Sequence, residues 1–156
     1  KTRELLGTTL EPFGAWLLIR GLRTLSVRMP RHQASGLRVA QWLAEQPMIA
    51  KVHHPGLPQH PQHALARNQM RGYGNLFSFE TYPIHKEQAF AFTDTLKLFR
   101  FGPSWGGYES LLLGWNIDQP DESGRARWLF RVYIGLEDPE DLIRDLAQGI
   151  GHLEAE

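Results

Sequence analysis

The sequence contains no cysteine among its 156 residues. This absence excludes disulfide bonds, a thiolate nucleophile and a zinc site with thiolate ligands, and it is typical of an intracellular protein. Net charge is also lacking, because 17 lysines and arginines balance 17 aspartates and glutamates. A basic surface of the kind that binds nucleic acid is therefore not expected.

Long hydrophobic runs are missing as well. The longest run covers residues 15–19, far short of the roughly 20 apolar residues that cross a bilayer. No charged segment followed by an apolar one opens the chain, so we expect no signal peptide. We predict a cytoplasmic protein with neither nucleic acid nor membrane among its partners.

Signatures of common catalytic sites are also absent. Gly106 and Gly107 have no further glycine at the offset that a dinucleotide-binding or phosphate-binding loop requires. No serine, histidine and aspartate form a local catalytic signature. None of the four lysines lies in a context that suggests a desolvated nucleophile. From these residues the chain offers a binding surface and no catalytic residue.

Four of the seven histidines cluster in one region: His53, His54, His60 and His63. His60 and His63 have a spacing that could hold a metal ion. However, Pro61 lies between them and no carboxylate is interleaved. We therefore favour roles in loops and helix caps, and we predict no metal site.

What the sequence does contain is an alternation of helices and short strands. The length and the 42% hydrophobic content predict one domain with its own core. Helices are expected from Pro12 to Gly21 and over 30–45, 61–70, 86–96 and 139–153, and strands over 49–54, 76–82, 97–101, 111–113 and 127–134. This order predicts an α/β fold, an α+β two-layer sandwich whose small, mostly antiparallel sheet is covered by helices.

Particular positions sharpen these expectations. Thr8 or Thr9 is expected to cap the first helix, which is apolar enough to be buried on most sides. Gly36, inside the second helix, costs about 1 kcal/mol relative to alanine, so we expect close packing there. The acidic residues of the last helix are explained by capping and by a solvated face.

Two features indicate a binding site. Ser104 and Trp105 precede paired glycines in a turn, which is either a hairpin corner with a packing tryptophan or a loop that contacts a ligand. Arg131 lies on the polar face of the strand 127–134. It forms either a surface salt bridge, with Glu80 or Glu109, or a site for a carboxylate or phosphate, which the guanidinium fork matches.

Several runs of the sequence, taken in order, resemble segments of one enzyme family. They are FGAWLLIRGLRTL at 13–25, VAQWL at 39–43, PGLP at 55–58 with His63, SWGGYESL at 104–111 and IGLED at 134–138. The family is the trans-sulfuration, or Cys/Met metabolism, family of pyridoxal-phosphate enzymes. The serine–tryptophan pair that opens SWGGYESL, and the absence of an HPASMTH segment after this motif, favour the cystathionine β-lyase branch.

The resemblance implies the C-terminal domain of a fold-type I enzyme. In that family the larger domain carries the cofactor lysine, in a Ser-x-Thr-Lys context that nothing here matches. We therefore expect residues 1–8 to end a linking helix from a missing pyridoxal-phosphate domain, and 9–156 to form the substrate-binding domain. Pro30 departs from the family pattern and predicts a kink or a later helix start.

The resemblance also implies a function. Arg131 falls where the family binds the substrate α-carboxylate, and Ser104 and Trp105 fall where it lines that pocket. The parent enzyme, expected to be a homotetramer, would cleave cystathionine by β-elimination to homocysteine, pyruvate and ammonia. This chain alone would hold no catalytic or cofactor-binding residue and would be inactive.

Two alternatives remain open. One is a γ-lyase or γ-synthase of the same family. The other is a free-standing interaction domain without catalysis, which an exposed apolar patch at Phe13, Trp16 and Leu17 would favour.

Overall fold

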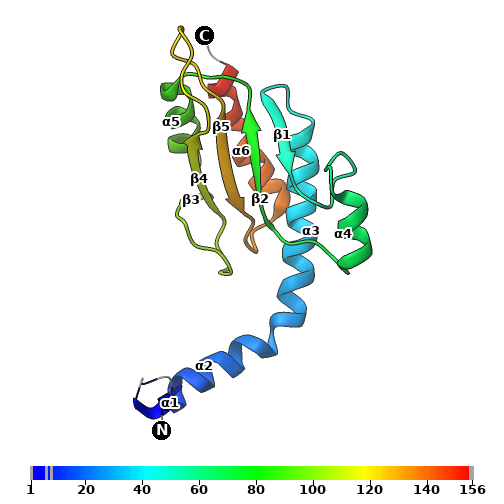
Figure 1. Ribbon diagram of the computed structural model, residues 1–156, viewed down its shortest axis with the longest axis vertical. Coiled ribbons are helices and arrows are strands. Elements are labelled where there is room, and N and C mark those ends of the chain that lie inside the picture. Colours follow the sequence, from blue (N-terminus) through cyan, green and yellow to red (C-terminus); the bar gives the residue numbers. More distant parts are fainter. Residues whose placement is uncertain (1, 6, 8, 155–156) are drawn as a thin grey trace. The chain divides into compact units, whose positions relative to one another are not determined.

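The computed structural model of the protein describes residues 2–5, 7 and 9–154. Its contacts divide the chain into two units, Lys1–Arg31 and His32–Glu156. The first unit holds two helices and the start of a third, and the second holds the sheet (Figure 1).

The first unit contains α1 (Thr2–Leu5) and α2 (Pro12–Arg23). Glu11 is the N-cap of α2, because its carboxylate accepts hydrogen bonds from the backbone N–H groups of Phe13, at 2.9 Å, and Gly14. The expected cap at Thr9 is therefore wrong, and Thr8 lies outside the described residues. The helix also continues through Gly21 and ends at Arg23.

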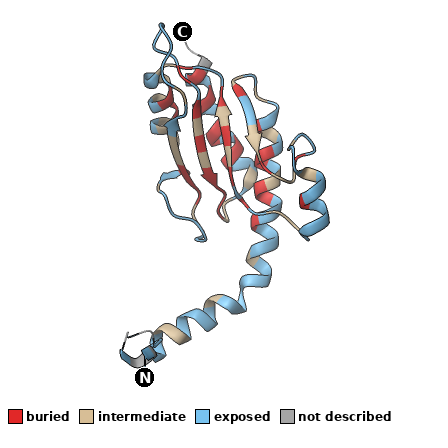
Figure 2. Ribbon diagram, viewed as in Figure 1, coloured by how far each residue is buried: buried red, intermediate tan, exposed pale blue. Residues whose placement is uncertain are grey.

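The side chains of α2 are exposed, contrary to the expectation of burial. The helix has no buried residue, and Figure 2 shows it almost entirely in the colour of exposed residues. Its large apolar side chains are exposed by 45% to 63%: Phe13, Trp16, Leu17, Leu18, Ile19 and Leu22. An apolar pattern predicts that a helix needs a covering surface, but it does not say which molecule supplies that surface.

Helix α3 spans Leu25–Ala44 and includes Pro30. The expected later start at Pro30 is wrong, because the helix accommodates a residue that lacks one backbone donor. Gly36 does pack closely, as predicted: a Cβ atom at this position would lie 2.8 Å from the Cα atom of Asn75.

The second unit contains a five-stranded sheet with the order β1-β2-β5-β4-β3. Its strands are β1 (Ile49–His53), β2 (Leu76–Thr81), β3 (Arg100–Phe101), β4 (Leu111–Asn116) and β5 (Trp128–Tyr133). All neighbours are antiparallel except β3 and β4, which are parallel. The predicted fold class is confirmed.

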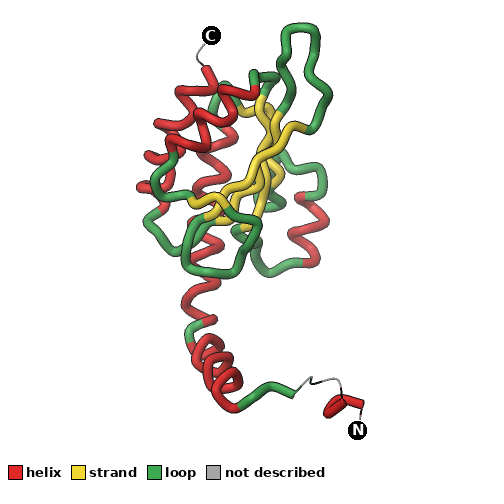
Figure 3. Tube along the Cα trace, turned by 90° about the vertical axis from the view of Figure 1, so that its left-hand side faces the viewer, coloured by secondary structure: helices red, strands yellow, loops and turns green. Residues whose placement is uncertain are grey.

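Helices cover this sheet (Figure 3). They include α4 (His63–Gln69), α5 (Lys86–Thr95) and α6 (Pro139–Glu154). The centre of the core is a cluster of Phe79, Phe92 and Phe130, whose ring centroids lie 5.0 to 6.3 Å apart. All three rings are fully buried, so one face of β2 and β5 packs against α5 at the centre of the core.

Strand β3 is three residues shorter than the predicted strand 97–101. The backbone N–H groups of Lys97 and Leu98 donate to the carboxylate of Asp145 at 2.9 Å and 2.8 Å. Asp145 is only 5% exposed. The prediction that capping and a solvated face explain every acidic residue of α6 is therefore wrong for Asp145, which holds a neighbouring segment.

Candidate functional site

The site centres on Arg131, in the middle of β5. Phe130 and Val132 on either side of it point into the core and are fully buried. Arg131 is half-buried on the opposite face, where its backbone pairs with Ser78 of β2 and Leu113 of β4. The alternation of β5 thus places one guanidinium group at the centre of the face that lies away from the core.

The guanidinium group of Arg131 is held by a loop. Its Nη2 atom donates hydrogen bonds to the backbone carbonyl of Pro103 and, at 3.2 Å, to that of Ser104. Among the described residues no carboxylate oxygen forms an ion pair with Arg131. Glu80, one of the two partners considered from the sequence, instead pairs with His53 and Arg127.

The loop 102–110 is the second part of the site. Ser104 and Trp105 both lie on it and are exposed, the tryptophan by 66%. Trp105 is therefore not the packing residue of a hairpin corner. Gly106 has a φ angle of +91°, in the region that favours glycine. The structure brings Ser104 to Arg131 through its backbone carbonyl, and it records no such contact for Trp105.

The far end of this loop is anchored by Tyr133, the last residue of β5, and by Glu137 just after the strand. Both carboxylate oxygens of Glu137 accept hydrogen bonds from Ser110, one from its N–H and one from its hydroxyl, each at 2.9 Å. Tyr133 donates its hydroxyl to the carbonyl of Gly107 at 2.9 Å. Ser110 and Glu137 both lie within the family motifs, but the motifs alone assign neither residue a role. The signal that could have found them is that SWGGYESL and IGLED occur in the same chain, because a serine in one motif and a glutamate in the other can pair.

A charged network lies beside the site. Arg127 binds Glu80 at 2.9 Å and Asp118 at 2.6 Å, and the other oxygen of Glu80 lies 2.6 Å from Nε2 of His53. The hydrogen bond from Arg127 lowers the pKa of Asp118 below its ordinary value. This network satisfies Glu80 locally and leaves Arg131 outside it.

Three of the four clustered histidines, His54, His60 and His63, contact the backbone. His54 is fully buried, lies 3.2 Å from the carbonyl of Gly74 through Nε2, and accepts the N–H of Gly56 through Nδ1. Burial lowers the pKa of His54. His63 binds the carbonyl of Pro55 at 2.8 Å. In the described part of the chain, no three histidine or acidic side chains form a group that could hold a metal ion.

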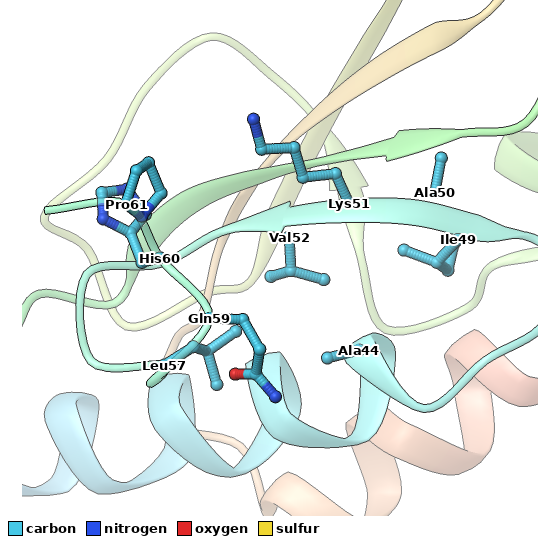
Figure 4. Close-up of a pocket in the computed structure, with 9 residues that line it drawn as sticks. All are labelled: Ala44, Ile49, Ala50, Lys51, Val52, Leu57, Gln59, His60 and Pro61. Carbon is cyan, nitrogen blue, oxygen red and sulfur yellow. The ribbon is translucent and has the colours of Figure 1, made fainter. Parts of the chain in front are cut away.

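One hollow lies between the end of α3, β1 and the loop after it (Figure 4). Its volume is about 190 Å³, and polar and hydrocarbon surface contribute about equally to its lining, the hydrocarbon part including Ile49, Val52 and Leu57. None of Ser104, Trp105 and Arg131 lines it. The predicted site is therefore distinct from this hollow.

The chain matches a known family when it is compared with known proteins. The sequence profile of the Cys/Met metabolism PLP-dependent enzymes matches residues 1–151. The chain is 41% identical over 155 residues to cystathionine β-lyase of Haemophilus influenzae, covering 93% of this chain and 38% of that protein. It is 39% identical over 153 residues to cystathionine γ-lyase of Rattus norvegicus, with 93% and 38% covered.

Solved structures of related enzymes have a similar fold. The fold is similar to that of cystathionine γ-synthase from Xanthomonas oryzae pv. oryzae, with a TM-score of 0.81 and 36% identity over 96% of this chain and 41% of that one. O-acetylhomoserine sulfhydrylase of Wolinella succinogenes gives a TM-score of 0.79 and 32% identity, with 96% and 41% covered.

The relatives share a family and differ in reaction. Their names include β-lyases, γ-lyases, sulfhydrylases and a γ-synthase, and the chain spans about two fifths of the length of those it matches. In the described residues, no helix is both long and apolar enough to cross a membrane. The chain belongs to the Cys/Met metabolism family of pyridoxal-phosphate-dependent enzymes.

Proposed function

We propose that this chain is the C-terminal, substrate-binding domain of a pyridoxal-phosphate-dependent carbon–sulfur lyase, and that Arg131 binds the α-carboxylate of its sulfur amino-acid substrate. The observation that supports this most directly is the position of Arg131. It is a half-buried guanidinium group on the sheet face away from the core, and it is oriented by backbone carbonyls rather than neutralised by a described acid.

This arrangement suits carboxylate binding. A guanidinium group carries five N–H donors, and the loop engages Nη2 alone. Nε and Nη1 then remain as charge-assisted donors in a plane that the loop has already set. The hydroxyl of Ser104 and the indole N–H of Trp105 lie on the same exposed loop, and we assign them to the wall of the pocket.

The described residues do not fit the cofactor itself. Lys86 lies over the ring of Phe90, with Nζ 5.2 Å from its centroid, and the segment of Lys97 is tied to Asp145. Among the described lysines, none has a recorded contact with Arg131 or its loop. When bound, pyridoxal phosphate supplies the electron sink for chemistry at the substrate α-carbon. We assign its lysine to a preceding domain that residues 1–8 would link to the domain at 9–156, and we expect this chain alone to be inactive.

The reaction we favour is β-elimination of cystathionine to homocysteine, pyruvate and ammonia, as a step of methionine biosynthesis in the cytoplasm. Three β-lyases are 39% to 41% identical to the chain, and the SWGGYES motif favours the same branch. A γ-lyase or γ-synthase is the alternative, since such relatives reach 36% to 40%. Pyruvate as the keto acid released from cystathionine by the full-length protein would support β-elimination, and 2-oxobutyrate would refute it.

The carboxylate site is tested by Arg131→Leu in the full-length protein. Losing a hydrogen-bonded charge partner costs about 2–4 kcal/mol, so KM should rise roughly 30- to 1000-fold, since about 1.4 kcal/mol corresponds to tenfold. The matched control is Arg38→Leu, which removes an exposed guanidinium group paired with Glu140. An unchanged KM in Arg131→Leu with an intact fold would remove Arg131 from the site.

The exposed apolar surface of α2 favours a second candidate function, a domain that associates with a partner. Phe13, Trp16 and Leu17 are 63%, 54% and 45% exposed, as that alternative requires. Analytical ultracentrifugation of the isolated chain tests it. Concentration-dependent association that Trp16→Ser abolishes would support an interaction domain. A monomer at all concentrations would argue against self-association through α2. Testing the homotetramer that we propose for the parent enzyme requires the full-length protein.

A further inference from the structure

We propose that Glu137 is a positioning residue for the carboxylate site: by clasping Ser110 it fixes the loop 102–110, whose carbonyls orient Arg131. This inference rests on the proposed function, because it concerns the same site. It adds Glu137, which lies after β5 and contacts the end of the loop at Ser110, whereas Arg131 contacts the other end at Pro103 and Ser104. The role follows from three sets of contacts.

The first set joins Glu137 to Ser110. The N–H of Ser110 donates to Oε1 and its hydroxyl donates to Oε2, both at 2.9 Å. The same hydroxyl oxygen accepts the N–H of Gly135 at 2.8 Å. The hydroxyl proton is therefore committed to Glu137, and Ser110, which is fully buried, has its position and its rotamer determined by residues 135–137.

The second set is the close approach of the two backbones. Leu136 donates its N–H to the carbonyl of Tyr108 at 2.7 Å. A Cβ atom on Gly135 would lie 2.6 Å from the carbonyl carbon of Glu109, and closer still to the oxygen of Tyr108. The space beneath 108–110 thus admits only glycine, and the carboxylate of Glu137 closes the contact from the side.

The third set shows why the loop needs a clasp. Residues 103–108 are all exposed, so no buried apolar side chain orders them. Their recorded anchors to β5 are Tyr133, which donates to Gly107, and Arg131, which donates to Pro103 and Ser104. A loop with few buried apolar contacts opens at a low free-energy cost once a polar contact is lost. Releasing Ser110 would therefore loosen the carbonyls that orient Arg131.

Glu137 acts through the loop rather than on the substrate. A carboxylate that faced the bound amino acid would repel its α-carboxylate, whereas both oxygens of Glu137 are engaged by Ser110. A glutamate suits this position because Ser110 presents two donors, a hydroxyl and a backbone N–H, and a carboxylate accepts both.

The test compares Glu137→Ala, Glu137→Gln and a matched control, Glu140→Gln, which changes an exposed acid paired with Arg38. In the isolated chain, the N–H groups of Gly135 and Leu136 donate to Ser110 and Tyr108 of the loop, and their exchange with solvent should speed up about tenfold or more in Glu137→Ala, because hydrogen bonds to a charged group are lost. Exchange at Phe79 and Phe130 should not change. Glu137→Gln, which keeps one acceptor, should give a smaller effect, and Glu140→Gln should give none.

In the full-length enzyme, Glu137→Ala should raise KM for the amino-acid substrate about tenfold, the factor that corresponds to one lost charge-assisted hydrogen bond. The value of kcat should change less than about twofold, because no reacting atom is touched. Glu137→Gln should restore part of the loss in KM.

Four results would overturn the inference. Exchange at Gly135 and Leu136 that stays at the wild-type rate in Glu137→Ala would show that no clasp exists. Equal acceleration at Phe79 and Phe130 would show a general effect on folding. A KM that rises in Arg131→Leu but not in Glu137→Ala would refute the positioning role alone, whereas a KM unchanged in Arg131→Leu would refute the carboxylate site and this role with it.

Discussion

The buried carboxylate of Asp145 holds the segment that leads into β3, and its removal gives a sharp test of that role. The backbone N–H groups of Lys97, Leu98 and Phe99 donate to it at 2.9, 2.8 and 3.4 Å. The side-chain amide of Gln148 donates at 2.6 Å. These three backbone groups precede a strand of two residues at the sheet edge, so the carboxylate replaces a neighbouring strand as their acceptor.

The magnitude depends on which donors water can reach. Asp145→Ala leaves three backbone donors without their acceptor. Water can replace it for the exposed Lys97 and Leu98, but Phe99 is only 5% exposed. With about 1–3 kcal/mol for a buried unsatisfied donor and about 1 kcal/mol for each of the two rehydrated ones, the free energy of unfolding should fall by about 3–5 kcal/mol.

Asp145→Asn should cost less, about 1 kcal/mol. Its carbonyl oxygen can still accept the N–H groups of Leu98 and Phe99. Its amide would then face Gln148, whose own amide can rotate to present an oxygen. The difference in unfolding free energy between Asp145→Ala and Asp145→Asn therefore reports the geometry of the hydrogen bonds as well as their strength.

Urea unfolding followed by circular dichroism measures both values. For a chain of this size, about 2–4 °C of Tm accompanies each kcal/mol, so Asp145→Ala should melt about 6–20 °C below the wild type. The control is Asp141→Ala on the same helix, which removes an exposed acid paired with Arg144 and should cost less than about 1 kcal/mol. Equal stability of Asp145→Ala and Asp141→Ala would refute the reasoning.

Two further predictions concern buried polar groups. Ser35 is 1% exposed, and its hydroxyl has no hydrogen-bond partner among the described residues. Ser35→Ala should thus be neutral or stabilise the chain by up to about 1 kcal/mol, through burial and helix propensity. A loss above that in urea unfolding would contradict this. For His54, burial lowers the folded pKa below 6.5, so the unfolded state binds more protons as the pH falls through that value. The free energy of unfolding should be fully maintained above about pH 7 and should fall below it, and His54→Gln should flatten this decline whereas the exposed His152→Gln should not. Parallel pH profiles for the wild type and His54→Gln would show that His54 does not titrate in this way.

The order of helices and strands was predictable from the sequence because it is a local property. The alternation from Trp128 to Ile134 places one set of side chains in the core, and the structure buries Trp128, Phe130, Val132 and Ile134. Where a prediction failed, the cause was not local. The strand predicted at 97–101 is shortened by Asp145, a residue 46 positions from Phe99, and periodicity carries no information about such a partner.

The candidate site likewise has features that the sequence predicts and features that only the folded chain shows. The sequence by itself determined the family, through motifs in a shared order, and it determined that Arg131 would lie on the polar face of its strand. Only the tertiary structure decided that Arg131 donates to the carbonyls of Pro103 and Ser104, and that Glu137 clasps Ser110. The physical reason is that a side chain's face follows from the period of its own strand, whereas its partners follow from the register between segments and from the path of a loop.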